Sequence, residues 1–189
     1  MIAQRILQSI ELKKQLLADS VMLARIDAAA GLIVQAYRSG HKTLFCGNGG
    51  SAADAQHLAA ELSGKFYIDR PPLQAEACHV NSSFMTAVSN DFGFDRAYAR
   101  YIEAVGQRGD VLIAISTSGN SENILHAIDQ AKGLGLSCIV LTGASGGRMA
   151  SKADLLLNMP SEDTPRIQEL HILIGHIICE MVEWELFGE

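Results

Sequence analysis

Residues 43–56 read TLFCGNGGSAADAQ, and the order of structures in this stretch decides the fold class. A short apolar run is followed by a turn of small residues, and the turn by a helical pattern. The same order recurs as VLIAISTSGNSENI at 111–124 and as IVLTGASGGRMA at 139–150. Strands that alternate with helices in this way predict a parallel sheet that is wound by helices.

The chain on either side extends this pattern. Apolar residues at helical spacing predict two helices within 2–37, which form an N-terminal helical hairpin, and a long helix at 164–187 with Thr164 as its N-cap. Further strands are expected at 75–80 and 155–160, and 82–106 is expected to be helical in two pieces. The predicted fold is a doubly wound five-stranded parallel α/β sheet. It forms a single domain over 1–189, with N-terminal helices at 1–40, an α/β core at 43–160 and a C-terminal helix at 164–187.

Composition bounds the function. The net charge of -6 and the lack of a basic cluster argue against nucleic-acid binding. No apolar stretch approaches the roughly 18 residues that a membrane span needs, so we expect no membrane partner. The four cysteines lie far apart and form no C-x-x-C pair. Cys46 and Cys138 fall within apolar runs and are expected to be buried thiols, which favours a cytoplasmic protein.

The three small-residue turns follow strands, at the edge where open α/β sheets bind ligands. The turn STSGNS at 116–121 carries four hydroxyl groups and no charge, which suits a phosphate monoester on a sugar. The alternative to phosphate binding is that this turn is only a helix N-cap with additional polar side chains. The P-loop pattern and the complete dinucleotide fingerprint are both absent from the sequence.

Two predicted helices carry a few polar side chains among mostly apolar residues. His57 and Glu61 are four residues apart and share one helix face, either as a surface pair or as part of a site. In the C-terminal helix, Gln168 and His176 could line one groove, whereas His171 points elsewhere. For either histidine of this helix, a hydrogen-bonded core position is the alternative.

Five separated motifs resemble the phosphoheptose isomerases of the sugar isomerase (SIS) domain superfamily, over about residues 30–185. They are CGNGGSAADAQHLAAELSGKF, NDFGF, GDVLIAISTSGNSENI, LTGASGG and PSEDTPRIQELHILIGHIICEMVE. The resemblance implies a flavodoxin-like fold and a homotetramer with active sites between subunits. It also implies an aldose–ketose isomerase that interconverts D-sedoheptulose 7-phosphate and D-glycero-D-manno-heptose 7-phosphate for lipopolysaccharide core or capsule.

The same resemblance implies the roles of individual residues. It makes Glu61 and His176 the acid–base pair, and it chooses His176 over His171. One zinc ion per subunit would be held by His57, Glu61, Gln168 and His176. The substrate-binding positions would be Asn48, Gly49, Gly50, Ser51, Glu61, Asn90, Asp91, Ser116, Thr117, Ser118, Ser121 and Gln168.

Two other functions are weighed against this one. A related non-catalytic branch of the family binds the bacterial replication initiator, but there the equivalents of Glu61 and His176 are replaced, and both are present here. Other SIS enzymes, such as arabinose 5-phosphate isomerases, usually have longer chains or extra domains than 189 residues allow. The resemblance therefore favours an isomerase.

Overall fold

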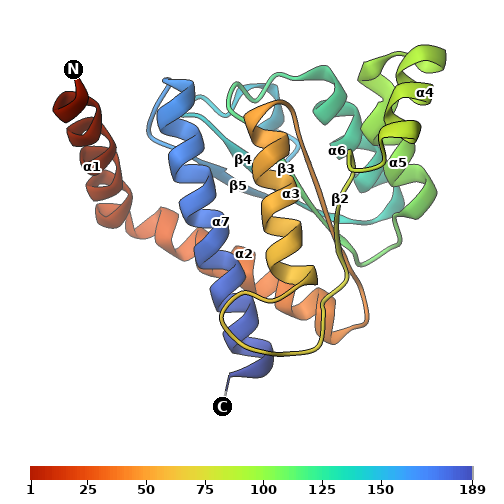
Figure 1. The fold of residues 1–189 in the computed structure, drawn as a ribbon, viewed down its shortest axis with the longest axis horizontal. Coiled ribbons are helices and arrows are strands. Elements are labelled where there is room, and N and C mark those ends of the chain that lie inside the picture. The colour runs from red at the N-terminus through yellow and green to blue at the C-terminus, as the bar shows by residue number, and fades with distance from the viewer. Residues whose placement is uncertain (189) are drawn as a thin grey trace.

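The computed structural model describes residues 1–188. A five-stranded parallel sheet forms its centre, with strand order β2-β1-β3-β4-β5 (Figure 1). The helices and strands are α1 Ile2–Ala18, α2 Ser20–Arg38, β1 Thr43–Gly47, α3 Gly50–Ser63, β2 Ala75–Ala77, α4 Ser82–Phe92, η1 Phe94–Arg96, α5 Ala97–Val105, β3 Val111–Ser116, α6 Glu122–Leu134, β4 Ser137–Thr142, η2 Gly147–Met149, β5 Leu155–Asn158 and α7 Thr164–Phe187. The predicted doubly wound sheet is confirmed.

The three central strands β1, β3 and β4 are apolar along most of their length and are buried on both faces of the sheet. Alternate residues of β1, β3 and β4 pack under α2, α3 and α7 on one face. The residues between them pack under α5 and α6 on the other face. Helices on both faces are the usual cover of a parallel sheet. Cys46 and Cys138 point into the second layer and are buried thiols, as predicted.

Three element boundaries differ from the predicted ones. The strand predicted over 155–160 is shorter, since β5 ends at Asn158. The strand predicted over 75–80 is only three residues long, since β2 lies at the sheet edge and pairs with β1 alone. The helix at 164–187 is capped by Asp163, so Thr164 is its first helical residue and not its N-cap. Gly93, with φ of 89°, separates α4 from the short η1 turn where the helical interruption was expected.

Helix α2 is long and apolar enough to span a membrane by length and composition alone. This corrects the expectation that no apolar stretch approaches that length. Arg25 and Asp27 interrupt the apolar residues of α2, so the sequence shows no continuous apolar run there. One face of α2 packs in the core, where Ile26, Ala29 and Ile33 are buried. A core helix passes the same test, so α2 is weak evidence for a membrane.

Helix α1 projects away from the sheet (Figure 1). Leu16 is its one buried residue among those described. Its apolar residues Ile2, Ile6, Leu7 and Ile10 are therefore exposed in the single chain.

Candidate active site

Two polar loops meet at the topological switch point of the sheet, between β1 and β3, where the order of strand addition reverses. The chain leaves β1 towards β2 on one side, and leaves β3 towards β4 and β5 on the other. Parallel sheets with this strand order bind ligands at the crevice between these two strands. The loop 47–51 follows β1 and the loop 116–121 follows β3, so both predicted substrate loops lie at this point.

The two loops are tied together by a pair of side-chain amides. Asn48 Nδ2 donates to Asn123 Oδ1 over 2.9 Å, and Asn123 Nδ2 donates to Asn48 Oδ1 over 2.8 Å. Asn123 is buried in the first turn of α6. Asn123 was not predicted as a site residue, although a polar residue next to the buried Ile124 and Leu125 needs a hydrogen-bond partner.

Glycines allow the first loop to turn sharply. A Cβ on Gly47 would lie 2.4–2.9 Å from the backbone and side chain of Ser51, and Gly49 has φ of 55°. Ser51 is buried, and its backbone N–H donates to the Asn48 carbonyl. The loop therefore presents the backbone of Gly49 and Gly50 to solvent.

The second loop combines hydroxyl groups with a helix N-terminus. Ser116 Oγ lies 3.3 Å from Ser121 Oγ, while Ser118 is exposed and Thr117 is half-buried. Ser121 is the N-cap of α6, and its side chain makes no capping hydrogen bond. The first N–H groups of a helix lack partners within it and lie at the positive end of the helix dipole. This loop thus has the donors that an anion needs.

The third loop, 143–149, supports the second one. The Gly143 N–H donates to the Thr117 carbonyl over 2.9 Å. A Cβ on Gly119 would collide with the Gly146 carbonyl, and one on Gly147 with the backbone of Ser118 and Gly119. The close contact of the two backbones leaves no space for a ligand between them, so the third loop packs behind the second.

A second group of functional side chains lies between α3 and α7. His57 Nε2 is 2.9 Å from His176 Nε2 and 3.1 Å from Glu61 Oε1. One ligand atom from each of these three residues lies within 4.8 Å of the other two, so the three could hold one metal ion. The His57 side chain is 51% exposed and that of Glu61 is 21% exposed. The cluster therefore opens to solvent in the single chain.

Gln168 lies two helical turns before His176 on α7. Its amide packs so closely on the first loop that a Cβ on Gly50 would collide with it. Gln168 thus contacts the predicted substrate loop, whereas the three other predicted metal ligands form the cluster.

The helices α3 and α7 pack closely at Gly175. A Cβ on Gly175 would lie 2.5 Å from Leu58 Cδ1, and Leu58 is 2% exposed. Glycine at position 175 is therefore the reason that His57 and His176 can touch across the two helices.

His171 lies in the core and not in the His57 cluster. It is fully buried, and its Nε2–H donates to the Thr142 carbonyl over 3.1 Å. Burial lowers the pKa of His171 to about 4, although the hydrogen bond to Thr142 opposes that shift. His171 is thus a neutral core histidine, which is the alternative that the sequence left open for either histidine of this helix.

Asn90 and Asp91 lie at the C-terminal end of α4, in the layer on the other face of the sheet. Both are exposed, and Asn90 Nδ2 donates to Asp91 Oδ1 over 2.8 Å. Among residues 1–188, neither makes a hydrogen bond or ion pair with the His57 cluster. One chain therefore does not bring together all of the residues that the resemblance implies.

Phe66 is a neighbour of the cluster that no pattern in the sequence indicated. Its ring stacks on that of His176, with centroids 5.7 Å apart and an interplanar angle of 22°. Phe66 lies in the segment that follows α3, outside any helix or strand.

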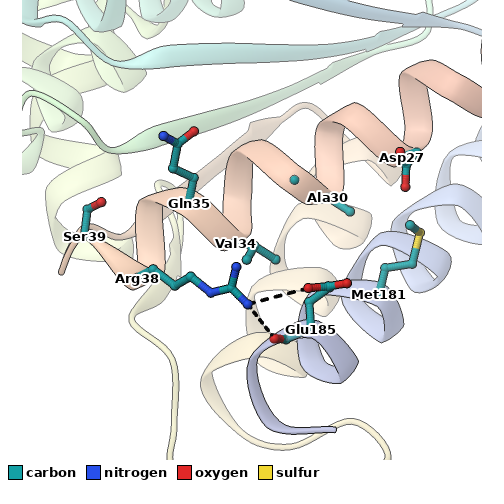
Figure 2. A pocket seen from close by; sticks show the side chains of 9 residues that line it. Asp27, Ala30, Val34, Gln35, Arg38, Ser39, Met181 and Glu185 are labelled. Carbon is teal, nitrogen blue, oxygen red and sulfur yellow. Dashed lines mark hydrogen bonds and ion pairs between the residues drawn. The ribbon is translucent and has the colours of Figure 1, made fainter.

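A groove between α2 and the end of α7 lies apart from these groups (Figure 2). Arg38 crosses it and contacts Glu185 through both the carboxylate and the backbone carbonyl. None of the predicted site residues lines this groove. It is therefore not part of the candidate active site.

Known proteins are similar to this chain over most of its length. The SIS domain family model matches residues 8–143. The phosphoheptose isomerase of Clostridium acetobutylicum is 50% identical over 188 residues, which cover 100% of this chain and 96% of that protein. Phosphoheptose isomerase 2 of Campylobacter jejuni is 50% identical over 181 residues, which cover 96% and 90% of the two chains.

Solved structures give the same result. The phosphoheptose isomerase of Neisseria gonorrhoeae superposes with a TM-score of 0.90 at 41% identity, covering 96% of each chain. That of Francisella tularensis superposes with a TM-score of 0.92 at 38% identity, covering 96% of this chain and 95% of the other. The similarity thus extends over nearly the whole length, including α3, α7 and both polar loops.

Proposed function

The chain belongs to the SIS-domain phosphoheptose isomerases, and from this membership we propose that it interconverts D-sedoheptulose 7-phosphate and D-glycero-D-manno-heptose 7-phosphate. The product would serve the synthesis of lipopolysaccharide core or capsule. The observation that carries the proposal is the close approach of Glu61, His57 and His176 between α3 and α7. An aldose–ketose isomerase needs such a group of proton carriers near a bound sugar phosphate.

The loop 116–121 binds the phosphate group in this proposal. Its hydroxyl groups and the N-terminus of α6 supply neutral donors and a positive dipole end. The backbone of the loop 47–51 and the amide of Gln168 would then contact the sugar. Asn90 and Asp91 are further substrate contacts in the proposed site.

The reaction moves one proton between two neighbouring carbons. Glu61 removes the proton from C1 of the ketose, and the electrons of that bond form the C1–C2 double bond of an enediol. His176 moves a proton from the C1 oxygen to the C2 oxygen, so that the carbonyl group changes position. Glu61 then returns its proton to C2. The charge that develops on the oxygens has to be stabilised by donors in the site.

The residues present suit a zinc ion. Two imidazoles and a carboxylate converge in the cluster, and this is a common ligand set of catalytic zinc sites. His57, Glu61 and His176 would hold one ion per subunit, with Gln168 as the fourth proposed ligand. Bound zinc would act as a Lewis acid that polarises the carbonyl and enediol oxygens. Because a carboxylate is a poorer base when it binds zinc tightly, Glu61 must bind the ion loosely or the ion must be structural.

We also propose a homotetramer with active sites between subunits. Two observations support it: α1 exposes apolar side chains, and Asn90 and Asp91 lie in a different layer from the His57 cluster. A neighbouring subunit would bring the separate parts together and cover the exposed His57. We further place the protein, as one domain, in the cytoplasm without nucleic-acid or membrane partners, in keeping with its four free buried cysteines and net charge of -6.

The alternative of a non-catalytic protein that binds the replication initiator is not favoured. The curated relatives at 50% identity are phosphoheptose isomerases. Glu61 and His176 are both present and adjacent to His57.

The test is the turnover of Glu61→Gln and His176→Gln. Each substitution keeps the size and polarity of the side chain but removes its proton transfer, so kcat should fall about 10²- to 10⁴-fold. Circular dichroism would check that both variants fold. Turnover at the wild-type rate by either folded variant would contradict its assigned role.

A further inference from the structure

A buried ion pair links the end of α3 to α7. Arg70 Nε donates to Glu183 Oε1 over 2.9 Å, and each side chain is only 1% exposed. Taking two charges out of water is costly, and such a pair is often no more stabilising than apolar residues of similar size. Stability alone therefore does not explain the pair, and the groups that the two charges hold in place have to be considered.

Arg70 binds the last turn of α3. Its guanidinium donates to the Glu61 carbonyl and to the Leu62 carbonyl, both over 2.9 Å. Carbonyl groups in the last turn of a helix lack partners within it. Arg70 thus fixes the backbone of the residue proposed as the catalytic base.

Glu183 binds the segment that follows α3. Its carboxylate accepts hydrogen bonds from the backbone N–H groups of Phe66, Tyr67 and Ile68, over 3.1, 2.7 and 2.9 Å. Burial opposes the charge of Glu183, but these donors and Arg70 outweigh it and hold the pKa of Glu183 below its ordinary value. The carboxylate therefore stays charged and keeps Phe66 in place.

Both partners act on the two helices that carry the cluster. Glu183 lies seven residues, or about two turns, after His176 on the same side of α7. Phe66, held by Glu183, stacks on the His176 ring. One ion pair thus connects the backbone of Glu61, the helix of His176 and the aromatic ring that limits rotation of the His176 imidazole.

We propose that Arg70 and Glu183 are positioning residues that hold Glu61 and His176 at the separation needed to share a metal ion. This deepens the function proposed above and rests on it. Groups around a metal site that orient its ligands change metal affinity by about 10- to 100-fold when they are removed. An ion pair that only stabilised the fold would not have this effect.

The protein contains a matched control. Lys42 and Asp110 form a second buried ion pair, with Lys42 Nζ 2.6 Å from Asp110 Oδ2. Asp110 also accepts from the backbone N–H groups of Lys42 and Gln107, so its hydrogen bonding resembles that of Glu183. This pair joins the starts of β1 and β3, at the opposite end of these strands from the two polar loops.

The experiment compares Glu183→Gln with Asp110→Asn in the full-length protein. Each substitution removes one buried charge, keeps the side-chain shape and leaves a cation unpaired. Three quantities are measured: the midpoint of urea unfolding, the affinity for Co²⁺ from the visible absorption of the bound ion, and the separate kcat and KM values for sedoheptulose 7-phosphate. We expect both variants to be destabilised. We expect Co²⁺ affinity to fall at least tenfold in Glu183→Gln and less than twofold in Asp110→Asn, with a lower kcat in the former only.

Phe66→Leu provides a second variant that keeps the ion pair intact. It removes the aromatic face next to His176, and we expect a smaller loss of Co²⁺ affinity, about threefold, with little change in the urea midpoint. If Glu183→Gln does not fold, Phe66→Leu still tests the proposal. A Co²⁺ affinity of Phe66→Leu equal to that of the wild type would then overturn it.

The remaining outcomes separate this proposal from the function. Equal Co²⁺ affinities in Glu183→Gln and Asp110→Asn would overturn the positioning role. A wild-type protein that turns over substrate but binds no Co²⁺ would overturn it as well and leave the isomerase intact. A wild-type protein that binds Co²⁺ but never isomerises the sugar would contradict the proposed function, and the affinities of the variants would still test the positioning role.

Discussion

Asn48 and Asn123 exchange two hydrogen bonds between their side-chain amides across the switch point between β1 and β3. The pair fixes the distance between the loop proposed to hold the sugar and the loop proposed to hold the phosphate. The resemblance assigns Asn48 to substrate binding. The structure indicates a positioning effect for its amide, which is already paired.

The two amides should therefore act as one unit. We expect Asn48→Ala and Asn123→Ala each to lower kcat/KM about tenfold, and the double variant to lose little more than either single variant, since all three lack the same interaction. Asn158→Ala is the control, because Asn158 ends the edge strand β5 and its amide donates to the Ala144 carbonyl, outside the loops 47–51 and 116–121. A multiplicative loss in the double variant would show instead that Asn48 contacts the substrate directly.

His171 should make the stability of the protein depend on pH. Its pKa is about 4 in the folded state and about 6.5 when unfolded, so the unfolded chain binds the extra proton between these values. The free energy of unfolding should therefore fall as the pH drops from 7 to 4, with about 3 kcal/mol of that loss due to His171.

His171→Gln tests this assignment, because Gln can still donate to the Thr142 carbonyl but does not titrate. Urea unfolding at a fixed protein concentration should give a curve of stability against pH that is flatter by that amount. Parallel curves for the two proteins would contradict the buried neutral state of His171.

At the scale of residues, the sequence predicted which side chains share a helix face better than it predicted contacts between distant residues. The spacing of His57 and Glu61 correctly placed both on one helix face, where they touch. Spacing left two histidines open on α7, and only the family resemblance selected His176. Asn123, Phe66 and Arg70 were not selected, because their importance depends on partners that lie 75 to 113 residues away in the sequence.

At the scale of elements, the contact between α3 and α7 depends on one glycine. Gly175→Ala places a methyl group against the buried Leu58, and the strain should outweigh the better helix propensity of alanine. We expect about 1–3 kcal/mol of destabilisation, a range typical of overpacked cores, and a lower kcat as His57 and His176 separate. Thermal unfolding and steady-state kinetics measure the two effects.

Gly31→Ala is the matched control in α2, where an added Cβ meets nothing within 4 Å. It should raise stability by up to about 1 kcal/mol and leave kcat unchanged. Gly175→Ala that behaved like Gly31→Ala would mean that the two helices can separate without loss of function.

The order and type of the elements could be predicted because apolar runs, small-residue turns and helical spacing are local signals. The apolar run that opens the stretch 43–56 predicts a strand over 43–47, and β1 has these bounds. Strand β2 was predicted too long, because its length is set by pairing with β1 alone at the sheet edge. The close approach of α3 and α7 could not be predicted, since Gly175 is an ordinary residue until Leu58 is known to face it.

At the scale of the whole molecule, α1 should lie in a subunit interface. Its residues Ile6, Leu7 and Ile10 are 43–63% exposed in the single chain, and a neighbouring subunit would bury them. Sedimentation of the wild-type protein should give about 80 kDa, four chains of 20.3 kDa each. A particle of 20.3 kDa would contradict the tetramer.

The double variant Ile6→Glu/Ile10→Glu should dissociate the assembly, because charged side chains are disfavoured at the centre of an interface. Activity should fall with the loss of the tetramer if the sites are completed between subunits. A monomer that retained full activity would show that one chain carries the complete site.

The central claim is the isomerisation of a seven-carbon sugar phosphate, and the most direct test is to incubate the purified protein with D-sedoheptulose 7-phosphate and follow the aldose by NMR. The account predicts that D-glycero-D-manno-heptose 7-phosphate forms until equilibrium is reached. Unphosphorylated sedoheptulose should react far more slowly, because it lacks the group that the loop 116–121 binds. A folded protein that forms no aldose from the phosphorylated ketose would contradict the account.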